Sequence, residues 1–203
     1  MTDLNVLEIK NLKKKKRQAV KEKQAGLLRE YIKYADEKIC CNILSLPEYQ
    51  NAKAVFCFIG TKDEINTKPL LEEILTSGKK LLVPKCRDAS EKHENKGIMD
   101  AFEITSLFQL EKGSYGILEP LSECRLADPK EIDLAVIPCL SCNEQGYRLG
   151  HGGGYYDRFL ENQNFTTAVI CRKQLFMPIP IESTDQKMDY VVSEEGIINV
   201  KNS

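Results

Sequence analysis

The segment Gly146–Arg158 contains the residues best suited to chemistry, and it reads Gly-Tyr-Arg-Leu-Gly-His-Gly-Gly-Gly-Tyr-Tyr-Asp-Arg. Four of the five residues from 150 to 154 are glycines, and they lie between a predicted strand and a predicted helix. Glycine lets backbone N–H groups approach an anion closely. Arg148 and Arg158 flank the loop, and Asp157 adds a candidate magnesium ligand. The pattern favours a phosphate-binding loop, with a tight structural turn as the alternative.

Spacing excludes two common nucleotide-binding loops. A Walker loop needs a Gly-Lys-Ser/Thr sequence, and none follows these glycines. The dinucleotide fingerprint needs a third glycine where this chain has Tyr155. The glycine loop is therefore a phosphate-binding candidate of another type.

A second candidate lies near the N-terminus, where Lys10, Lys13, Lys14, Lys15, Lys16, Arg17, Lys21 and Lys23 stand close together with Glu22 as the only acid. Such a run can be a solvated helix face or a site for a polyanion such as a nucleoside triphosphate. RNA binding is disfavoured because the run has no interleaved aromatic residues and no RNA-binding signature.

The chain has eight cysteines, but no apolar segment of a secretory signal, so a disulfide framework is not expected. Cys139 and Cys142 have the spacing of a metal-ligand pair. A zinc site would need a second pair at similar spacing, none exists, and His93 and His151 are isolated. The pair leads into the glycine loop rather than directly into a helix, which argues against a redox motif. We expect reduced, structural thiols.

The apolar pattern indicates the elements that must position these residues. A helical stripe runs from about Lys10 to Leu44, with Gly26 as a possible break. A helix begins at Thr67 and stops at Gly78, another spans Tyr155–Leu160, and buried strands are predicted at 54–59, 81–83, 133–137, 167–171 and 190–192. Residues 87–97 read as a surface loop, 98–110 are unassigned, and 113–116 read as a turn. Strands that alternate with helices predict an α/β fold with a mostly parallel sheet.

Length and composition restrict the class of protein. The 203 residues are 42% hydrophobic and 29% charged, which excludes disorder over most of the chain and suits one domain, residues 1–203, with 1–9 as a flexible N-terminal extension. The net charge of −1 provides no global field for nucleic acid. No run of 18 apolar residues predicts a membrane span. We expect a cytoplasmic protein.

The segment Arg148–Asp157 resembles the signature of the 5-formyltetrahydrofolate cyclo-ligase family, also called 5,10-methenyltetrahydrofolate synthetases. Other segments resemble the family in the same order, from about residue 10 to residue 195: Lys13–Arg17, Phe58–Thr67, Val83–Lys85, Tyr115–Pro120, Pro180–Asp185 and Asp189. The resemblance therefore covers nearly the whole chain.

The resemblance implies a three-layer α/β/α sandwich and an enzyme that depends on ATP and Mg²⁺. In this family 5-formyltetrahydrofolate is cyclised to 5,10-methenyltetrahydrofolate with release of ADP and phosphate. Phosphorylation of the formyl oxygen activates it, and folate N10 then attacks. The partners implied are ATP and the folate, with no nucleic acid or membrane, and the chain is expected to be a monomer.

The resemblance also implies roles for individual residues. The expected ATP-binding residues are Lys13, Lys14, Lys15, Lys16, Arg17, Arg148, Leu149, Gly150, His151, Gly152, Gly153, Gly154, Tyr155 and Tyr156. The expected catalytic residues are Arg148 and Tyr156, the expected folate-binding residues are Ile59, Glu64, Tyr115 and Tyr156, and the expected metal ligands are Asp157 and Asp185. Each has a structural alternative: Glu64 can be a solvated carboxylate, Ile59 a core residue and Asp185 a turn cap.

Three positions depart from the family pattern. Cys142-Asn143 stands where an aromatic residue and an aspartate are usual, Gln24 where many members have a second arginine, and His151 where an arginine or aromatic residue is usual. None of them removes an expected phosphate or metal contact. They leave open a second hypothesis, a non-catalytic nucleotide- or folate-binding module on the same fold.

Overall fold

The computed structural model describes residues 5–87, 97–113 and 116–201. An eight-stranded sheet forms its centre, in the spatial order β12 (Gly196–Asn199), β11 (Tyr190–Ser193), β10 (Thr166–Ile170), β7 (Leu134–Ile137), β1 (Ala54–Cys57), β2 (Lys80–Cys86), β3 (Met99–Ile104) and β6 (Arg125–Ala127). The strands from β11 to β2 run parallel, whereas β12, β3 and β6 pair antiparallel at the two edges. The predicted α/β class with a mostly parallel sheet is confirmed.

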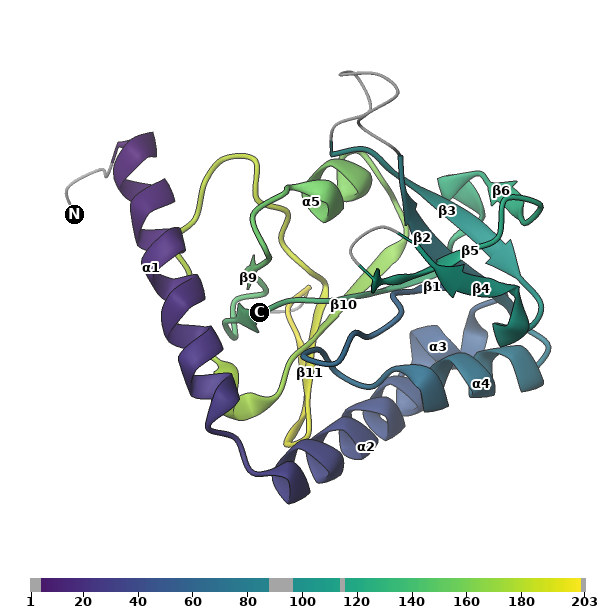
Figure 1. Ribbon diagram of the computed structural model, residues 1–203, viewed down its shortest axis with the longest axis horizontal. Coiled ribbons are helices and arrows are strands. Elements are labelled where there is room, and N and C mark those ends of the chain that lie inside the picture. The colour runs from purple at the N-terminus through teal and green to yellow at the C-terminus, as the bar shows by residue number, and fades with distance from the viewer. Residues whose placement is uncertain (1–4, 88–96, 114–115, 202–203) are drawn as a thin grey trace.

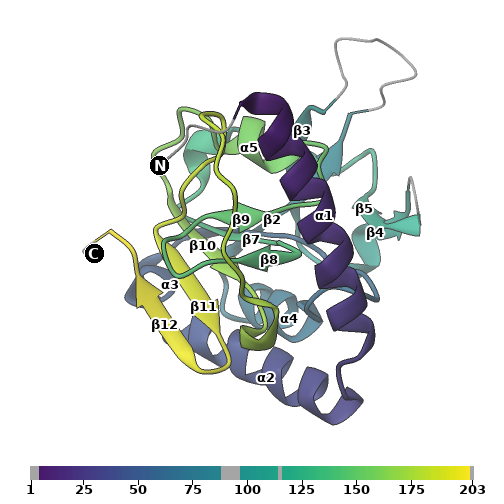
Figure 2. The same cartoon turned by 90° about the vertical axis from the view of Figure 1, so that its left-hand side faces the viewer.

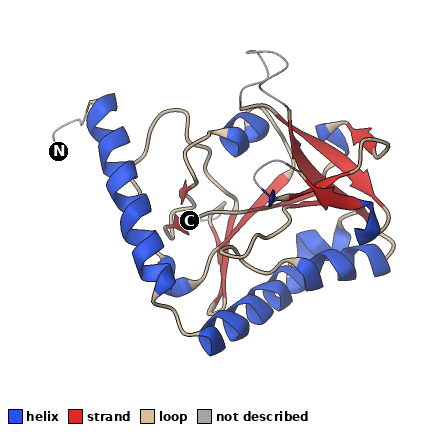
Figure 3. Cartoon of the chain, viewed as in Figure 1, coloured by secondary structure: helices blue, strands red, loops and turns tan. Residues whose placement is uncertain are grey.

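Helices cover both faces of this sheet, as the blue ribbons on either side of the red strands show (Figure 3). They are α1 (Val6–Ala25), α2 (Arg29–Ser45), α3 (Pro47–Asn51), α4 (Lys68–Thr76) and α5 (Tyr155–Leu160), with the short 3₁₀ helices η2 (Leu107–Gln109), η4 (Pro129–Glu131) and η5 (Lys173–Leu175). Figure 2 shows α5 on one side of the strands and α2, α3 and α4 on the other. None of the helices in the described ranges is both long and apolar enough to cross a membrane.

The alternation of side chains along the strands produces two separate cores. Val55 and Cys57 of β1 pack in the layer with α2, α3 and α4, whereas Ala54 and Phe56 pack in the layer with α5 and Val20 of α1. Successive residues of a strand face opposite sides, so a strand that is apolar throughout must be covered twice. The three-layer arrangement follows from this pattern.

The N-terminal helical segment breaks at Gly26, as the sequence indicates. Asn5 and Glu8 form a reciprocal capping box at the start of α1, and Gly26 follows its last turn. The sequence predicts a flexible extension over residues 1–9, whereas residues 6–9 form the first turn of α1, because this cap starts the helix earlier than the apolar stripe does. Residues 1–4 lie outside the described ranges.

Thr67 precedes α4, but its side chain does not cap the helix. Its hydroxyl donates to Phe58 O and accepts from Gly60 N, each at 2.9 Å, while Asn66 Oδ1 accepts from Lys68 N at 3.2 Å. Thr67 therefore fixes the loop that leaves β1, and this loop carries two expected site residues. Pro69 lies in the first turn of α4, as predicted.

Two short hairpins complete the fold. The unassigned segment 98–110 contains β3, η2 and the first residue of β4 (Leu110–Lys112), which pairs with β5 (Leu118–Pro120). The other hairpin joins β8 (Ser141–Cys142) to β9 (Arg148–Leu149) and leads directly into the glycine loop. In its register Cys142 lies opposite Arg148. The second hairpin therefore positions the arginine that precedes the loop.

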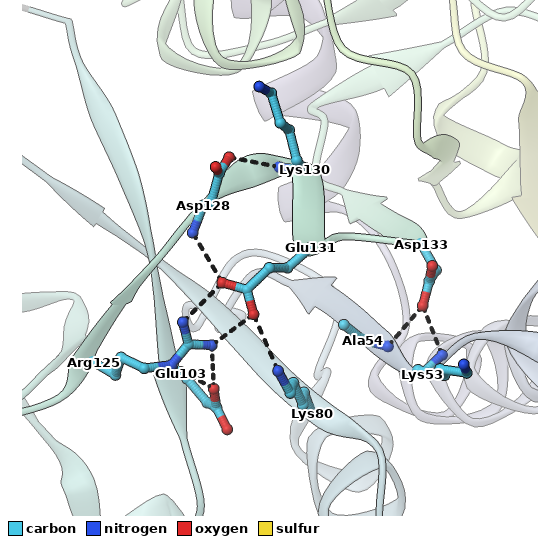
Figure 4. A network of polar contacts seen from close by, with 9 residues as sticks. All are labelled: Lys53, Ala54, Lys80, Glu103, Arg125, Asp128, Lys130, Glu131 and Asp133. Carbon is cyan, nitrogen blue, oxygen red and sulfur yellow. Dashed lines mark hydrogen bonds and ion pairs between the residues drawn. The ribbon is translucent and has the colours of Figure 1, made fainter.

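The amino ends of the parallel strands carry an ion-pair network of surface side chains (Figure 4). Arg125 bonds Glu103 and both carboxylate oxygens of Glu131, and Lys80 Nζ reaches Glu131 Oε2 at 3.1 Å. Nearby, Asp133 Oδ2 accepts from the backbone N–H groups of residues 53 and 54 at 2.7 and 2.9 Å. The network joins β6, β3, η4 and the start of β2 at one end of the sheet.

Candidate active site

A cavity of about 1560 Å³ opens at the opposite end, where the parallel strands have their carboxyl termini. Residues that follow β1 and β7 line it, together with the last residues of β2, the glycine loop and α1, which stands upright beside the strands (Figure 1). Ligands of open α/β sheets bind outside the carboxyl ends of the strands. The expected site residues among its lining are Lys13, Arg17, Ile59, Glu64, Arg148, Leu149, Gly150, His151, Gly152, Gly153, Gly154, Tyr155, Tyr156, Asp157 and Asp185.

Arginines hold the glycine loop in its conformation. Arg17 Nε donates to Gly150 O at 2.8 Å. Gly152 has φ of +102°, and a Cβ there would lie 3.2 Å from the Arg17 guanidinium carbon, so a glycine is needed for the backbone and for the close approach. Arg158 donates to the carbonyl oxygens of Gly97 and Gly153. Arg158 therefore holds the loop from α5, and Arg17 holds it from α1.

Lys13 lies at the second cationic position of α1 and is only 5% exposed. Its Nζ lies 2.6 and 2.7 Å from the two oxygens of Asp185 and 2.8 Å from Glu182 Oε2. A buried ammonium requires such partners. An expected phosphate contact and an expected metal ligand thus form one ion-paired group, and Glu182 is a site residue that the sequence analysis did not assign.

The other three lysines of the run, Lys14, Lys15 and Lys16, are not among the cavity residues. Positions 13 and 17 are four apart and therefore share one face of α1, and both side chains line the cavity. The expectation that the whole run Lys13–Arg17 contacts the nucleotide therefore finds no support at these three positions.

Arg148 joins the loop to α5. Its Nη2 donates to Asp157 Oδ1 at 2.8 Å, and its guanidinium carbon lies 5.7 Å from the centre of the Tyr156 ring. The side chain is 4% exposed, and its Nε is buried without a hydrogen-bond partner among the described residues. Burial raises the pKa of Tyr156 well above its usual value, so the phenol keeps its proton. The cavity thus has a cation with one unused donor and a neutral phenol beside it.

Glu64 lies on the loop after β1 and lines the cavity. Its Oε2 accepts from Thr61 N at 3.0 Å, and its Oε1 lies 3.6 Å from His151 Nε2. Burial raises the pKa of Glu64, but hydrogen bonds from His151 and Thr61 favour the carboxylate and leave the pKa lowered. An ionised Glu64 therefore faces the cavity as an acceptor, beside the half-buried Ile59.

A buried ion pair anchors the Glu64 loop from below. Arg172 lies two residues beyond β10. It donates from Nε and Nη2 to both oxygens of Asp36 on α2, at 2.7 and 2.9 Å. Nη2 also donates to Glu64 O, and Asp36 Oδ2 accepts from Asn66 N, each at 2.9 Å. The side chains of Arg172 and Asp36 are 4% and 9% exposed. Nothing in the sequence alone pairs two residues 136 positions apart.

Three thiols form a cluster, of which Cys139 lines the cavity. The Sγ atoms of Cys139, Cys142 and Cys171 lie within 4.8 Å of one another, and none of the eight cysteines forms a disulfide. Hydrogen bonds from the thiols of Cys139 and Cys142 lower the pKa of Cys171, with Arg172 acting in the same direction. Their spacing in the sequence relates Cys139 and Cys142 as a pair, but no spacing connects Cys171 to them.

The remaining departures have local structural roles. Asn143 Oδ1 accepts from Tyr147 N at 2.9 Å and closes the β8–β9 turn, and the Gln24 side chain donates to Asp63 O next to the Glu64 loop. Tyr115, an expected folate contact, lies outside the described residues.

The geometry combines two chemistries in one cavity. Near α1 and the glycine loop, cationic side chains and backbone N–H groups suit a polyphosphate, and the carboxylates of Asp157 and Asp185 suit a hard cation. Elsewhere in the lining, Glu64 offers a hydrogen-bond acceptor, and Ile59 and Phe102 offer apolar surface. A charged ligand and a flat, mostly apolar ligand can therefore meet there.

Comparisons with known proteins agree with this description. The sequence profile of the 5-formyltetrahydrofolate cyclo-ligase family matches residues 9–194. A probable 5-formyltetrahydrofolate cyclo-ligase of Schizosaccharomyces pombe is 29% identical, with 93% of this chain and 98% of the relative covered. The 5-formyltetrahydrofolate cyclo-ligase of Escherichia coli is 26% identical over 88% of this chain and 98% of its own.

Solved structures of similar proteins have the same fold. The NMR structure of Aquifex aeolicus 5,10-methenyltetrahydrofolate synthetase superposes with a TM-score of 0.81 at 28% identity, covering 95% of this chain and 94% of that one. A 5,10-methenyltetrahydrofolate synthetase from Mycoplasma pneumoniae shares the fold, with a TM-score of 0.71 at 19% identity over 90% of this chain and 98% of its own.

Proposed function

Because the chain belongs to the 5-formyltetrahydrofolate cyclo-ligase family, we propose that it converts 5-formyltetrahydrofolate and ATP to 5,10-methenyltetrahydrofolate, ADP and phosphate. One observation carries the proposal: the glycine loop with its arginines and the Glu64 loop line the same cavity. A γ-phosphate near the first and a pterin near the second would be close enough to react.

The proposed reaction begins with activation of the formyl oxygen, which is a poor leaving group. The oxygen attacks the γ-phosphorus, ADP leaves, and an iminium phosphate forms. Folate N10 then adds to the activated carbon, the ring closes, and phosphate departs as the N10 proton is released. Phosphoryl transfer depends mainly on positioning and neutralised charge. Lys13, Arg17 and Arg148 supply positive charge, and the backbone of the glycine loop supplies further donors.

Arg148 and Tyr156 are the proposed catalytic residues. The buried, unpaired Nε of Arg148 would donate to a phosphate oxygen, which satisfies a group that otherwise costs free energy. Tyr156 stays protonated and lies beside this guanidinium, so it can donate to the formyl or phosphoryl oxygen. On the folate side, Glu64 would accept a hydrogen bond from the pterin and Ile59 would contact its ring.

Magnesium fits the donor set at the mouth of the cavity. Asp157 and Asp185 provide hard carboxylate oxygens, and Mg²⁺ needs few protein ligands because it keeps waters and phosphate oxygens. Both carboxylates already bind cationic side chains, Arg148 and Lys13 respectively, so this region is built for positive charge. When bound, the ion would neutralise developing phosphate charge.

Turnover of the purified chain tests the proposal. Incubation with 5-formyltetrahydrofolate and MgATP should produce the near-ultraviolet absorbance of the methenyl product together with ADP. Binding of both ligands by calorimetry without any product would instead favour the non-catalytic module. A monomeric state and a cytoplasmic location stay predictions from the sequence, and sedimentation of the purified chain checks the first.

A magnesium titration tests whether the two aspartates share the ion. Asp157→Asn and Asp185→Asn should each lower turnover and raise the magnesium needed for half activity, and the double variant should lose little more. Residues that act as a unit are non-additive in this way. Additive losses with an unchanged magnesium requirement would contradict a shared ion.

A further inference from the structure

The cysteine cluster Cys139, Cys142 and Cys171 is not used by the proposed reaction. Cys139 lies two residues beyond β7, and Cys171 directly follows β10. These neighbouring strands run parallel, so both cysteines lie at the carboxyl end of the sheet. Cys142, in the β8–β9 hairpin, lies beside them. The topology therefore brings together three sulfurs from two strand ends and a hairpin.

The sulfurs lie close to the spacing of a metal site. Zinc–sulfur bonds of about 2.3 Å at tetrahedral angles place the ligand sulfurs about 3.8 Å apart. The three Sγ atoms already lie within 4.8 Å of one another. Each pair of sulfurs would have to approach by at most about 1 Å to reach the spacing of zinc ligands.

Backbone hydrogen bonds hold all three positions. Cys171 N donates to Val192 O at 3.0 Å, and Met177 N donates to Cys142 O at 3.1 Å. Leu140 N, next to Cys139, donates to Leu149 O at 2.8 Å. A cation would bind to ligands that are already ordered, so little conformational entropy opposes the binding.

The cluster is closed on one side and open on the other. Cys142 and Cys171 are 0% and 2% exposed, whereas Cys139 is half-buried and lines the cavity. A cation can enter from the cavity, and a water molecule can complete a fourth position there. Three protein ligands with one open position form a known arrangement for zinc.

Two arginines adjoin the thiols. Arg148 lies opposite Cys142 in the hairpin register, and Arg172 follows Cys171 in the chain. Three thiolates around Zn²⁺ leave one net negative charge, which nearby guanidinium groups stabilise. An all-sulfur ligand set selects thiophilic cations over Mg²⁺.

We propose that Cys139, Cys142 and Cys171 form a binding site for one zinc ion, distinct from the magnesium site proposed at Asp157 and Asp185. The proposal does not depend on turnover, because it rests on sulfur geometry and access alone.

Zinc binding by the full chain in reducing buffer tests the site directly. Competition with a chromophoric chelator should give one tightly bound Zn²⁺ per chain. Cobalt in place of zinc should give an intense thiolate-to-cobalt charge-transfer band in the near ultraviolet. The variants Cys142→Ser and Cys171→Ser should each lower zinc affinity by more than the roughly 10–100-fold that loss of an outer-shell partner causes.

Cys41→Ser is the matched control, because Cys41 is an exposed thiol on α2 outside the cluster. It should bind zinc like the unaltered chain. A second measurement uses the unaltered chain only, so it does not depend on variants that fold poorly: zinc should protect Cys139 from alkylation, and leave Cys41 reactive. Failure to bind zinc, or binding that survives loss of Cys142 or Cys171, would overturn the site. Alkylation of Cys139 that zinc does not slow would also overturn it.

Discussion

The charged groups at the two ends of the sheet differ in their exposure to solvent. At the amino end, Arg125, Glu131 and Lys80 form ion pairs whose side chains are 47%, 29% and 50% exposed (Figure 4). At the carboxyl end, the side chains of Lys13 and Arg148 are 7% and 4% exposed, and the Arg172–Asp36 pair beneath them is equally buried.

This difference in exposure distinguishes charges on the surface from charges at the cavity. Exposed ion pairs gain little because water and salt screen them. Buried pairs lose their hydration, and an apolar replacement is often as stable, so burial of charge is weak support for a purely stabilising role. At the carboxyl end, the buried cations Lys13 and Arg148 both line one cavity. We infer that these charges serve ligands, whereas those at the amino end serve only the local structure.

The largest expected effect is on stability, in Asp36→Asn. The change leaves the Arg172 guanidinium buried and without its charged partner, which typically costs about 3–5 kcal/mol. Urea unfolding followed by circular dichroism measures the loss. Loosening of the Glu64 loop should also raise the Michaelis constant for the folate, because Arg172 donates to Glu64 O.

The double variant Asp36→Leu/Arg172→Met separates these two effects. It removes both charges and should recover much of the stability, since no unpaired charge stays buried. The raised folate constant should persist, because Arg172→Met removes the guanidinium that anchors Glu64 O. Recovery of both properties would show that the pair stabilises the fold and does not position the loop.

The next effect is on nucleotide use, in Arg148→Ala. Loss of one charge-assisted phosphate contact costs roughly 1.5–3 kcal/mol, or about one to two decades in apparent ATP affinity. Arg125→Ala, at the amino end, is the matched arginine control and should leave the ATP constant unchanged. Steady-state kinetics with each substrate varied in turn provide the measurement. A collapse of folate binding with unaltered ATP affinity would refute the assignment.

A smaller effect is expected for Glu64→Gln. The amide keeps the shape but weakens acceptance of a pterin hydrogen bond, so the folate constant should rise roughly tenfold, as for one hydrogen bond of about 1–1.5 kcal/mol. The pKa of Glu64 is lowered, so the folate contact should hold at neutral pH and fail only as the pH falls through that lowered value. Kinetics across pH with both forms test this, and an unaltered folate constant would make Glu64 a surface carboxylate.

The sequence predicts the framework because its signals are local. The apolar runs that become β1, β7 and β10 and the break at Gly26 depend on residues close together in the chain. The glycine loop is equally local. Strand β3, which lies between β2 and β6, escapes prediction because its buried and half-buried residues do not alternate regularly.

The contacts of the site depend on positions far apart, which no spacing reveals. Lys13 and Asp185 lie 172 positions apart, and the sequence predicts them as a phosphate contact and a metal ligand. In the structure their side chains bond each other. The third thiol, Cys171, joins the Cys139–Cys142 pair only because β7 and β10 are neighbours in the sheet. Side chains from different strands meet through the topology, and the topology is fixed by the whole core.

The smallest effect is expected at the amino end, in Glu131→Gln. Hydrogen bonds from Arg125, Lys80 and Asp128 N lower the pKa of Glu131 from 4.5 to about 2. A lowered pKa in the folded state means that the carboxylate stabilises the fold above its unfolded pKa. This contribution disappears as the pH falls from about 4.5 to about 2. The unaltered chain and the variant should therefore differ slightly at neutral pH in low salt and converge in acid or high salt, because the pairs face solvent. Urea unfolding at several pH and salt values measures the convergence, and turnover should be unaffected throughout. A loss of unfolding free energy as large as that of Asp36→Asn, or a loss of turnover, would contradict the inference that charges at the amino end serve only the local structure.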